Sequence, residues 1–101
     1  MELDIRVGTI LICEKIAGSE KMLRLEVDLG DLGNRQILTG IGKWYSPEDL
    51  VGMKTIFLTN IEPKVMMGLE SQGMLMAVDS HDGKPVFLTP NGDTVNGDKV
   101  I

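Results

Sequence analysis

Apolar and polar residues alternate along much of this chain, and the alternation predicts a series of short β-strands. In the segment MLRLEVDL (22–29), every second side chain from Leu23 to Leu29 is apolar, and the side chains between them are charged. Alternation with a period of two is typical of a strand that buries one face. Other runs rich in apolar or β-branched residues predict strands at 4–16, 35–41, 53–60, 73–79 and 85–90.

The positions of glycine and proline predict the turns, the bend and the short helix that connect these strands. Gly8, inside the first run, predicts a bend or bulge there, and GDLGN (30–34) predicts a tight turn. A short helix is predicted at 46–50, because Ser46 can cap it, Pro47 suits its first position and two acidic residues follow in its first turn.

The predicted order is three strands, a short helix, two strands and a β-rich tail. Closely spaced strands with Gly-rich turns favour a small barrel, and this order matches the OB-fold, an all-β, five-stranded Greek-key barrel. We therefore expect a single domain over 1–101, with the barrel at about 1–80 and an extra C-terminal β segment at about 81–101. OB-folds bind oligonucleotides on strands two and three and on the loops after strands one and four. Here those loops are 17–21 and about 60–73.

The composition indicates what kind of core, disulfide, metal site and compartment to expect. Aromatic residues make up only 4% of the 101 residues, so we expect an aliphatic, Met-rich core. Cys13 is the one cysteine, which excludes an intrachain disulfide framework, and it is expected in the core as a small apolar residue. His81 has no partners at zinc-ligand spacing, so neither a metal nor a cofactor is expected. With no secretory or membrane-length apolar segment, the expected compartment is the cytoplasm.

The formal net charge of −5 argues mildly against a nucleic-acid partner, because phosphate binding needs positive charge. What attracts a polyanion, however, is the local placement of cations rather than their sum. Eight of the ten Lys and Arg residues lie before Val65. The tail is therefore acidic, whereas the first two thirds of the chain are nearly balanced.

Five segments spread over nearly the whole chain form one pattern, and they are LDIRVGTI, GSEKMLRLEVDLG, RQILTGI, TNIEPKVMMGLESQGMLMA and GDTVNGDKV. In these segments the chain resembles the tRNA-binding domain of many methionyl-tRNA synthetases, of stand-alone tRNA-binding proteins and of eukaryotic synthetase-associated factors. The most specific part is 60–77, where Asn, Pro, a basic residue, Met, Gly, Ser and Gly-Met follow in the family's order. The chain resembles most an archaeal-type C-terminal domain, or a separately encoded β subunit, of methionyl-tRNA synthetase.

The resemblance implies a non-catalytic module that binds tRNA and assists a methionyl-tRNA synthetase, with no membrane partner. Within its most specific part, the candidates for tRNA contacts are Asn60, Lys64, Met66 and Ser71. Lys21, Arg24, Arg35 and Lys43 are further candidates, because they lie on strands two and three of the expected barrel or on the flanking loops. The cations would follow the phosphate backbone, and the others would meet bases or sugars. Because the family forms homodimers through its C-terminal region, the candidates for a dimer interface are Val86, Leu88, Val95 and Val100.

Each candidate also has a plainer interpretation. Lysines and arginines are often solvated surface charges, and Asn60 and Ser71 can make local turn bonds instead of RNA contacts. Methionines can fill the core. The aromatic pair Trp44 and Tyr45 can stack on bases, but Trp44 is expected to pack against the short helix or an interface, and Tyr45 is left open.

Two positions depart from the family pattern. Many relatives carry Pro-Arg-Lys before the first Met of 60–77, where this chain has Pro63-Lys64-Val65, and Arg after that Met, where this chain has Met67. The segment has less positive charge as a result. We expect weaker tRNA binding, or binding that needs a dimer or a synthetase partner.

A second class of function stays open at this point. A secretion-associated chaperone shares the barrel, Met-rich loops suit adaptable peptide contacts, and the acidic balance favours a protein-interaction module. A hydrolase is not expected, because the sequence has no nucleophile–base pair, no paired acids at a defined spacing and no phosphate-binding glycine loop.

Overall fold

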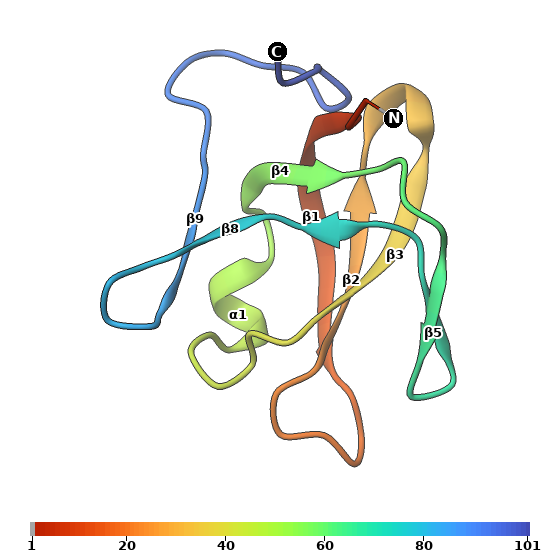
Figure 1. The fold of residues 1–101 in the computed structure, drawn as a ribbon, viewed down its shortest axis with the longest axis vertical. Coiled ribbons are helices and arrows are strands. Elements are labelled where there is room, and N and C mark those ends of the chain that lie inside the picture. Colours follow the sequence, from red (N-terminus) through yellow and green to blue (C-terminus); the bar gives the residue numbers. More distant parts are fainter. Residues whose placement is uncertain (1) are drawn as a thin grey trace.

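The computed structural model describes residues 2–101, and five of its strands form one antiparallel sheet (Figure 1). They are β1 (Ile5–Lys15), β2 (Leu23–Asp28), β3 (Asn34–Thr39), β4 (Lys54–Leu58) and β7 (Met74–Leu75), in the spatial order β3-β2-β1-β4-β7. The chain just before β7 returns to β3, where Gln72 N donates a hydrogen bond to Gln36 O (2.7 Å). The sheet is thus nearly closed into a barrel, which confirms the predicted OB-like fold.

The long strand β1 pairs with β4 along its first half and with β2 along its second half. The bulge predicted at Gly8 lies instead between Ile10 and Ile12, where the register with β2 shifts. Gly8 has a different role. A Cβ there would lie 2.8 Å from Leu29 Cδ2 and 2.9 Å from Val27 Cγ1, so the absence of a side chain allows close packing of β1 on these residues.

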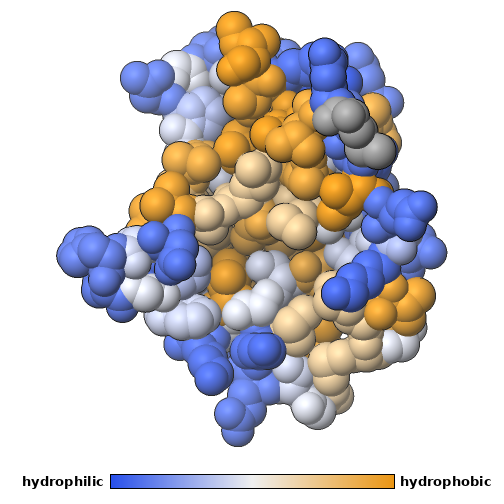
Figure 2. Space-filling model, in the orientation of Figure 1, coloured by the Kyte–Doolittle hydropathy of each residue, from blue (hydrophilic) through white to orange (hydrophobic). Residues whose placement is uncertain are grey.

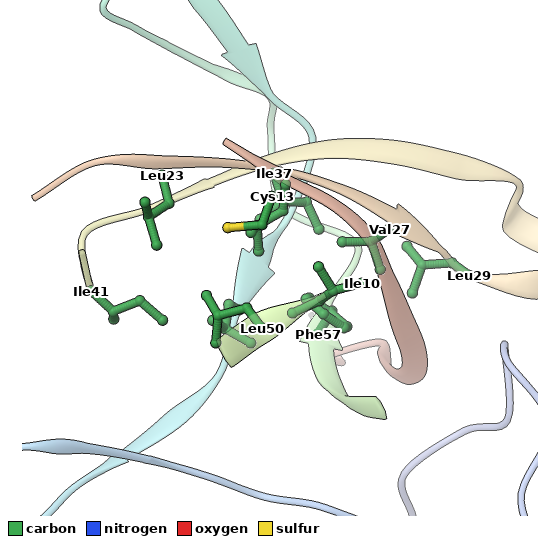
Figure 3. Close-up of a cluster of buried hydrophobic side chains, with 11 residues drawn as sticks. Ile10, Cys13, Leu23, Val27, Leu29, Ile37, Ile41, Leu50 and Phe57 are labelled. Atoms are coloured by element: carbon green, nitrogen blue, oxygen red, sulfur yellow. The ribbon is translucent and has the colours of Figure 1, made fainter. Parts of the chain in front are cut away.

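The barrel interior is filled by aliphatic side chains around Phe57 (Figure 3). The cluster consists of Ile10, Cys13, Leu23, Leu25, Val27, Leu29, Ile37, Ile41, Leu50, Phe57 and Leu75. The alternation predicted for 22–29 and the buried Cys13 are confirmed. The expected Met-rich core is wrong: within residues 2–101 no methionine belongs to the buried cluster, and Met53 only packs against it. Branched aliphatic side chains and Phe57 already fill the space.

The helix α1 (Pro47–Leu50) is a single turn, as predicted. Asp49 Oδ2 accepts hydrogen bonds from Ser46 N (2.9 Å) and Ser46 Oγ (3.0 Å), and Leu50 is buried in the core. The predicted turn after β2 contains a 3₁₀ turn, η1 (Gly30–Leu32). None of the helices in residues 2–101 has the length and apolarity required to cross a membrane.

Two segments differ from the sequence prediction. The segment 60–73, predicted as the loop after the fourth strand, contains a hairpin of β5 (Lys64–Met66) and β6 (Leu69–Ser71). The predicted strand 73–79 is divided, because β7 stays in the barrel whereas β8 (Ala77–Asp79) pairs with β9 (Pro85–Phe87). In Figure 1 the β8–β9 arm projects from one side of the barrel and the β5–β6 hairpin from the other.

The end of the chain returns to the barrel and lies along the first half of β1. Gly97 N donates to Val7 O (2.8 Å), and Val7 N donates to Asp98 O (2.9 Å). This approach needs a glycine in the turn after β2, since a Cβ at Gly30 would lie 1.9 Å from Asn96 O. The tail is therefore tied to the barrel by backbone hydrogen bonds.

Candidate nucleic-acid interface

A groove of about 180 Å³ lies between the outward face of β3 and the β5–β6 hairpin. It is lined by Leu38, Ile61, Glu62, Lys64, Met66, Ser71, Gly73 and Met74. The structure thus brings three of the predicted tRNA-binding residues, Lys64, Met66 and Ser71, into one depression. Leu38 faces outward from the strand pair, opposite Arg24 in register, yet it is buried beneath the hairpin.

Ser71 joins the hairpin to β3 at the base of the groove. It is 4% exposed, and its Oγ accepts a hydrogen bond from Leu38 N (3.0 Å) and donates one to Gly73 O (3.1 Å). The neighbouring Gln72 Oε1 accepts from Gln36 N (2.9 Å). These two side chains accept hydrogen bonds from backbone N–H groups of β3, which a neighbouring strand would otherwise accept. The hydroxyl of Ser71 therefore makes the local backbone bonds, and its contact with tRNA stays a prediction.

Arg24 lies beside the groove on the outward face of β2. Its Nε donates to Gln36 Oε1 (2.7 Å), and its Nη1 donates to Glu14 Oε1 (2.8 Å). Gln36 Nε2 in turn donates to Glu70 O on β6 (2.8 Å). Within residues 2–101, Nη2 of Arg24 has no hydrogen-bond partner, so this nitrogen is available as a donor. The guanidinium is thus linked to the hairpin and still has a free edge.

Lys21 and Lys43 lie on two loops that touch at one end of the barrel. Gly42 N donates to Lys21 O (2.7 Å), so the two backbones are in direct contact. The tip of the hairpin reaches the same end, since a Cβ at Gly18 would lie 4.0 Å from Met67 Cε. In Figure 1 the loop between β1 and β2 is at the bottom, with the hairpin beside it. Both lysines are exposed, and Lys21 belongs to the loop that the hairpin tip approaches.

Arg35 and Asn60 lie near the base of the hairpin, and both bind backbone groups. Arg35 Nη1 donates to Thr59 O (2.6 Å) and Gln72 O (3.3 Å). Asn60 Oδ1 accepts from Asp4 N (2.8 Å). Arg35 therefore ties the start of the hairpin segment to its end, and Asn60 holds the N-terminal segment. Neither role can be predicted from the sequence, because the hydrogen-bond partners of Arg35 and Asn60 are distant from them in the chain.

The charge around the groove is mixed. Lys64 is exposed and, among residues 2–101, makes no ion pair. Glu62 lines the same groove, and Glu14 balances part of the charge on Arg24. A phosphate approaching the hairpin would therefore meet one free ammonium and one partly neutralised guanidinium.

Sequence reasoning missed Gln36 and Gln72, which connect β3 to the hairpin. Their pairing required knowing that 69–72 lies beside β3, and glutamine on a strand carries no local signal of such a role. Tyr45, left open above, is structural: its Oη donates to Pro85 O (2.7 Å), and its ring centroid lies 4.8 Å from that of Phe87. Trp44 is nearly half exposed and lines a separate groove beside β8.

The four tail residues predicted to form a dimer interface, Val86, Leu88, Val95 and Val100, are all exposed. Leu88 and Val100 line an apolar groove of about 410 Å³. Figure 2 shows apolar side chains (orange) reaching from the C-terminal end at the top toward the middle of this face. Such a surface suits an interface, and the homodimer itself stays a prediction.

Within residues 2–101, no three His, Cys, Asp or Glu side chains are grouped so that they could hold a metal ion.

Comparison with known proteins identifies the family. The family model named "Putative tRNA binding domain" matches residues 5–99. A methionine–tRNA ligase of Methanothrix thermoacetophila is 48% identical over 95 residues, and one of Porphyromonas gingivalis is 42% identical over 100 residues. These matches cover 94% and 99% of this chain but 14% and 15% of the ligases, so the chain spans about one seventh of their length.

Solved structures share the whole barrel and its tail. A MetRS-related protein from Pyrococcus horikoshii is 37% identical with a TM-score of 0.91, over 98% of this chain and 90% of that one. The chaperone CsaA from Bacillus anthracis is 35% identical with a TM-score of 0.86, over the same shares. The family match is to a tRNA-binding domain, as the resemblance in the sequence implied. Because the family model matches residues 5–99, nearly the full length of the chain, this chain belongs to the tRNA-binding domain family.

Proposed function

We propose that this domain binds tRNA along the groove between β3 and the β5–β6 hairpin, recognises its shape and backbone, and assists a methionyl-tRNA synthetase. Family membership supports the tRNA ligand, and the methionine–tRNA ligases among its relatives support the synthetase partner. The observation that carries the proposal is the groove itself, which is lined by Lys64, Met66 and Met74 and adjoins the strand pair that carries Arg24. Among residues 2–101, Lys64 has no ion pair and Nη2 of Arg24 has no hydrogen-bond partner.

The chemistry of this groove suits a region of RNA whose bases are not stacked in a double helix. Lys64 supplies a point charge for a phosphate, and Arg24 supplies a planar donor on the neighbouring strand. Met66 and Met74 offer polarizable apolar surface on which an unstacked base can rest. Phosphate contacts orient the RNA without reading its sequence, so recognition of shape is expected.

Acidic residues limit the strength of this interaction. Glu62 in the groove and Glu14 beside Arg24 repel phosphate, and the net charge of the chain is −5. We therefore propose modest affinity for one domain. A homodimer formed through the apolar tail around Leu88 and Val100 would place two such surfaces on one molecule, and two linked weak sites gain avidity when both engage.

The test is a salt series of tRNA binding to the wild type and two lysine variants. Electrostatic capture predicts that binding weakens steeply with salt and that Lys64→Ala lowers the slope by about one unit. Lys84→Ala is the control, because Lys84 lies at the turn of the β8–β9 arm on the other side of the barrel. No tRNA binding at low salt, or equal slopes for all three proteins, would contradict the proposal.

A second candidate function is binding of unfolded peptides. It is supported by the 35% identity to the chaperone CsaA and by the apolar groove around Leu88 and Val100. Binding of a fluorescent unfolded peptide, together with no binding of tRNA at low salt, would favour this second function.

A further inference from the structure

Three methionines lie at the proposed tRNA groove or on the hairpin beside it, and within residues 2–101 none belongs to the buried core cluster. Met66 and Met74 line the groove, and Met67 forms the tip of the hairpin. Met67 is 48% exposed and Met74 is 51% exposed. Thioether sulfurs at such positions are open to peroxides in solution, whereas Met53 is partly buried against the core cluster and is less accessible.

Met67 holds an unfavourable backbone conformation. Its φ of +52° is the one positive value among the non-glycine residues of 2–101, and Gly68 follows with a φ of +77°. A two-residue hairpin turn with two positive φ angles favours Asn-Gly, so methionine at its first position is strained. The side chain reaches the loop between β1 and β2 at Gly18. A strained residue that connects two loops of a site is a candidate for a functional role.

The thiol of this chain does not compete for the oxidant. Cys13 is buried in the core, and burial raises the pKa of its thiol to about 11. Thiolate is the reactive form, and it is scarce at neutral pH when the pKa is so high. A peroxide that meets the folded domain therefore encounters exposed thioethers first.

We infer that Met67 and Met74 are oxidation sites through which peroxide weakens RNA binding at this groove, an inference that rests on the proposed function. In this step a sulfur lone pair attacks one peroxide oxygen. An S–O bond forms, the O–O bond breaks, and the second oxygen leaves with both protons as water. The thioether loses two electrons and the peroxide gains them. Methionine sulfoxide reductases reverse the change.

The sulfoxide alters the groove in two ways. It replaces a soft apolar surface by a polar, chiral group that accepts hydrogen bonds and has no donor for a phosphate. At Met67 it also adds a polar oxygen to a side chain whose methyl end points toward the β1–β2 loop at Gly18. Both changes remove favourable contacts for a base resting on the hairpin.

The experiment treats the intact domain with hydrogen peroxide, maps sulfoxides by peptide mass spectrometry and measures tRNA affinity before and after. We expect Met67 and Met74 to be oxidised before Met53, and tRNA binding to weaken about two- to tenfold, the effect of losing one or two sulfur–aromatic contacts. Treatment with methionine sulfoxide reductase should restore it. A Met67→Leu/Met74→Leu variant should keep its affinity after peroxide, whereas the control Met53→Leu should lose affinity like the wild type.

The outcomes separate the two proposals. Earlier oxidation of Met53, or unchanged tRNA affinity in protein that carries sulfoxides at both sites, overturns the oxidation inference alone. Untreated protein that does not bind tRNA overturns the proposed function, and it also overturns the inference that oxidation weakens tRNA binding. Loss of affinity in the double leucine variant after peroxide assigns the effect to other residues and also overturns the inference.

Discussion

Leu38 N donates a hydrogen bond to Ser71 Oγ over 3.0 Å, and this contact joins β3 to the hairpin that covers it. The two residues are separated by 33 positions in the chain. Because Ser71 is nearly inaccessible to water, its hydroxyl is the partner on which the buried Leu38 amide depends. One side chain therefore contributes both to the closure of the barrel and to the lining of the groove.

Replacing Ser71 by alanine should destabilise the domain by about 1–3 kcal/mol, because it leaves a buried N–H without a partner. Urea unfolding followed by circular dichroism measures this change. Ser80→Ala, in the turn before β9, is the control and should have a smaller effect, since that hydroxyl bonds to groups in an exposed turn. Equal effects at both serines would show that the Leu38–Ser71 bond has no special role.

Gly30 should tolerate alanine far less well than Gly33. At Gly30 a Cβ would lie 1.9 Å from Asn96 O and φ is +63°, whereas at Gly33 φ is +77° and nothing lies within 4 Å. We expect a loss of about 2–5 kcal/mol for Gly30→Ala, against about 1–2 kcal/mol for Gly33→Ala, where only the left-handed conformation is penalised. Thermal unfolding of both variants provides the comparison, and similar melting temperatures would contradict the close packing of the tail.

Met67→Asn should be more stable than Met67→Ala by about 1 kcal/mol, because asparagine adopts the left-handed conformation more readily. Both variants lack the long side chain that extends toward Gly18, so their difference isolates the backbone contribution. Urea unfolding at neutral pH measures it. An alanine variant that is as stable as the asparagine variant would mean that the tip is not strained.

Burial should keep the Cys13 thiol protonated and protected in the folded domain. The pKa is raised from 9.0 to about 11, first by burial and then by Glu48 and Glu14. Since the folded-state value is the higher one, its contribution to stability is complete below about pH 9 and is lost as the pH rises through about 11.

Two measurements check this prediction. A thiol reagent at pH 8 should label Cys13 slowly in the native protein and quickly in urea. Unfolding experiments from pH 7 to pH 11 should show a steeper loss of stability for the wild type than for Cys13→Ala. Fast labelling of the native protein, or identical pH dependence, would contradict a buried, protonated thiol.

Self-association through the tail predicts that Leu88→Asp shifts the protein from dimer to monomer, because a charge in an apolar interface is not compensated. Light scattering at micromolar concentration reports the mass. Val51→Asp is the control, since Val51 is also exposed but lies after α1 rather than in the tail. A wild-type protein that is already monomeric refutes the homodimer.

Local sequence pattern was sufficient for most of the barrel. The alternation from Leu23 to Leu29 identified a strand and its buried face, and the Ser46-Pro47 pair identified the start of α1. These predictions succeed because burial of one strand face and capping of a helix depend on residues within a few positions. The hairpin tip was missed because Met67 occupies a turn position where the usual signal is asparagine or glycine.

The contacts of the candidate site, in contrast, could not be predicted from local sequence pattern. Sequence similarity located the segment that contains Lys64, but only the fold showed that Ser71 bonds to β3 and that Arg24 is held by Glu14 and Gln36. Such contacts join residues that are 10 to 33 positions apart, and no local pattern encodes which partner a polar side chain will meet. Strand identity is a short-range property of the chain, whereas the availability of a cation or a hydroxyl depends on what the closed barrel places beside it.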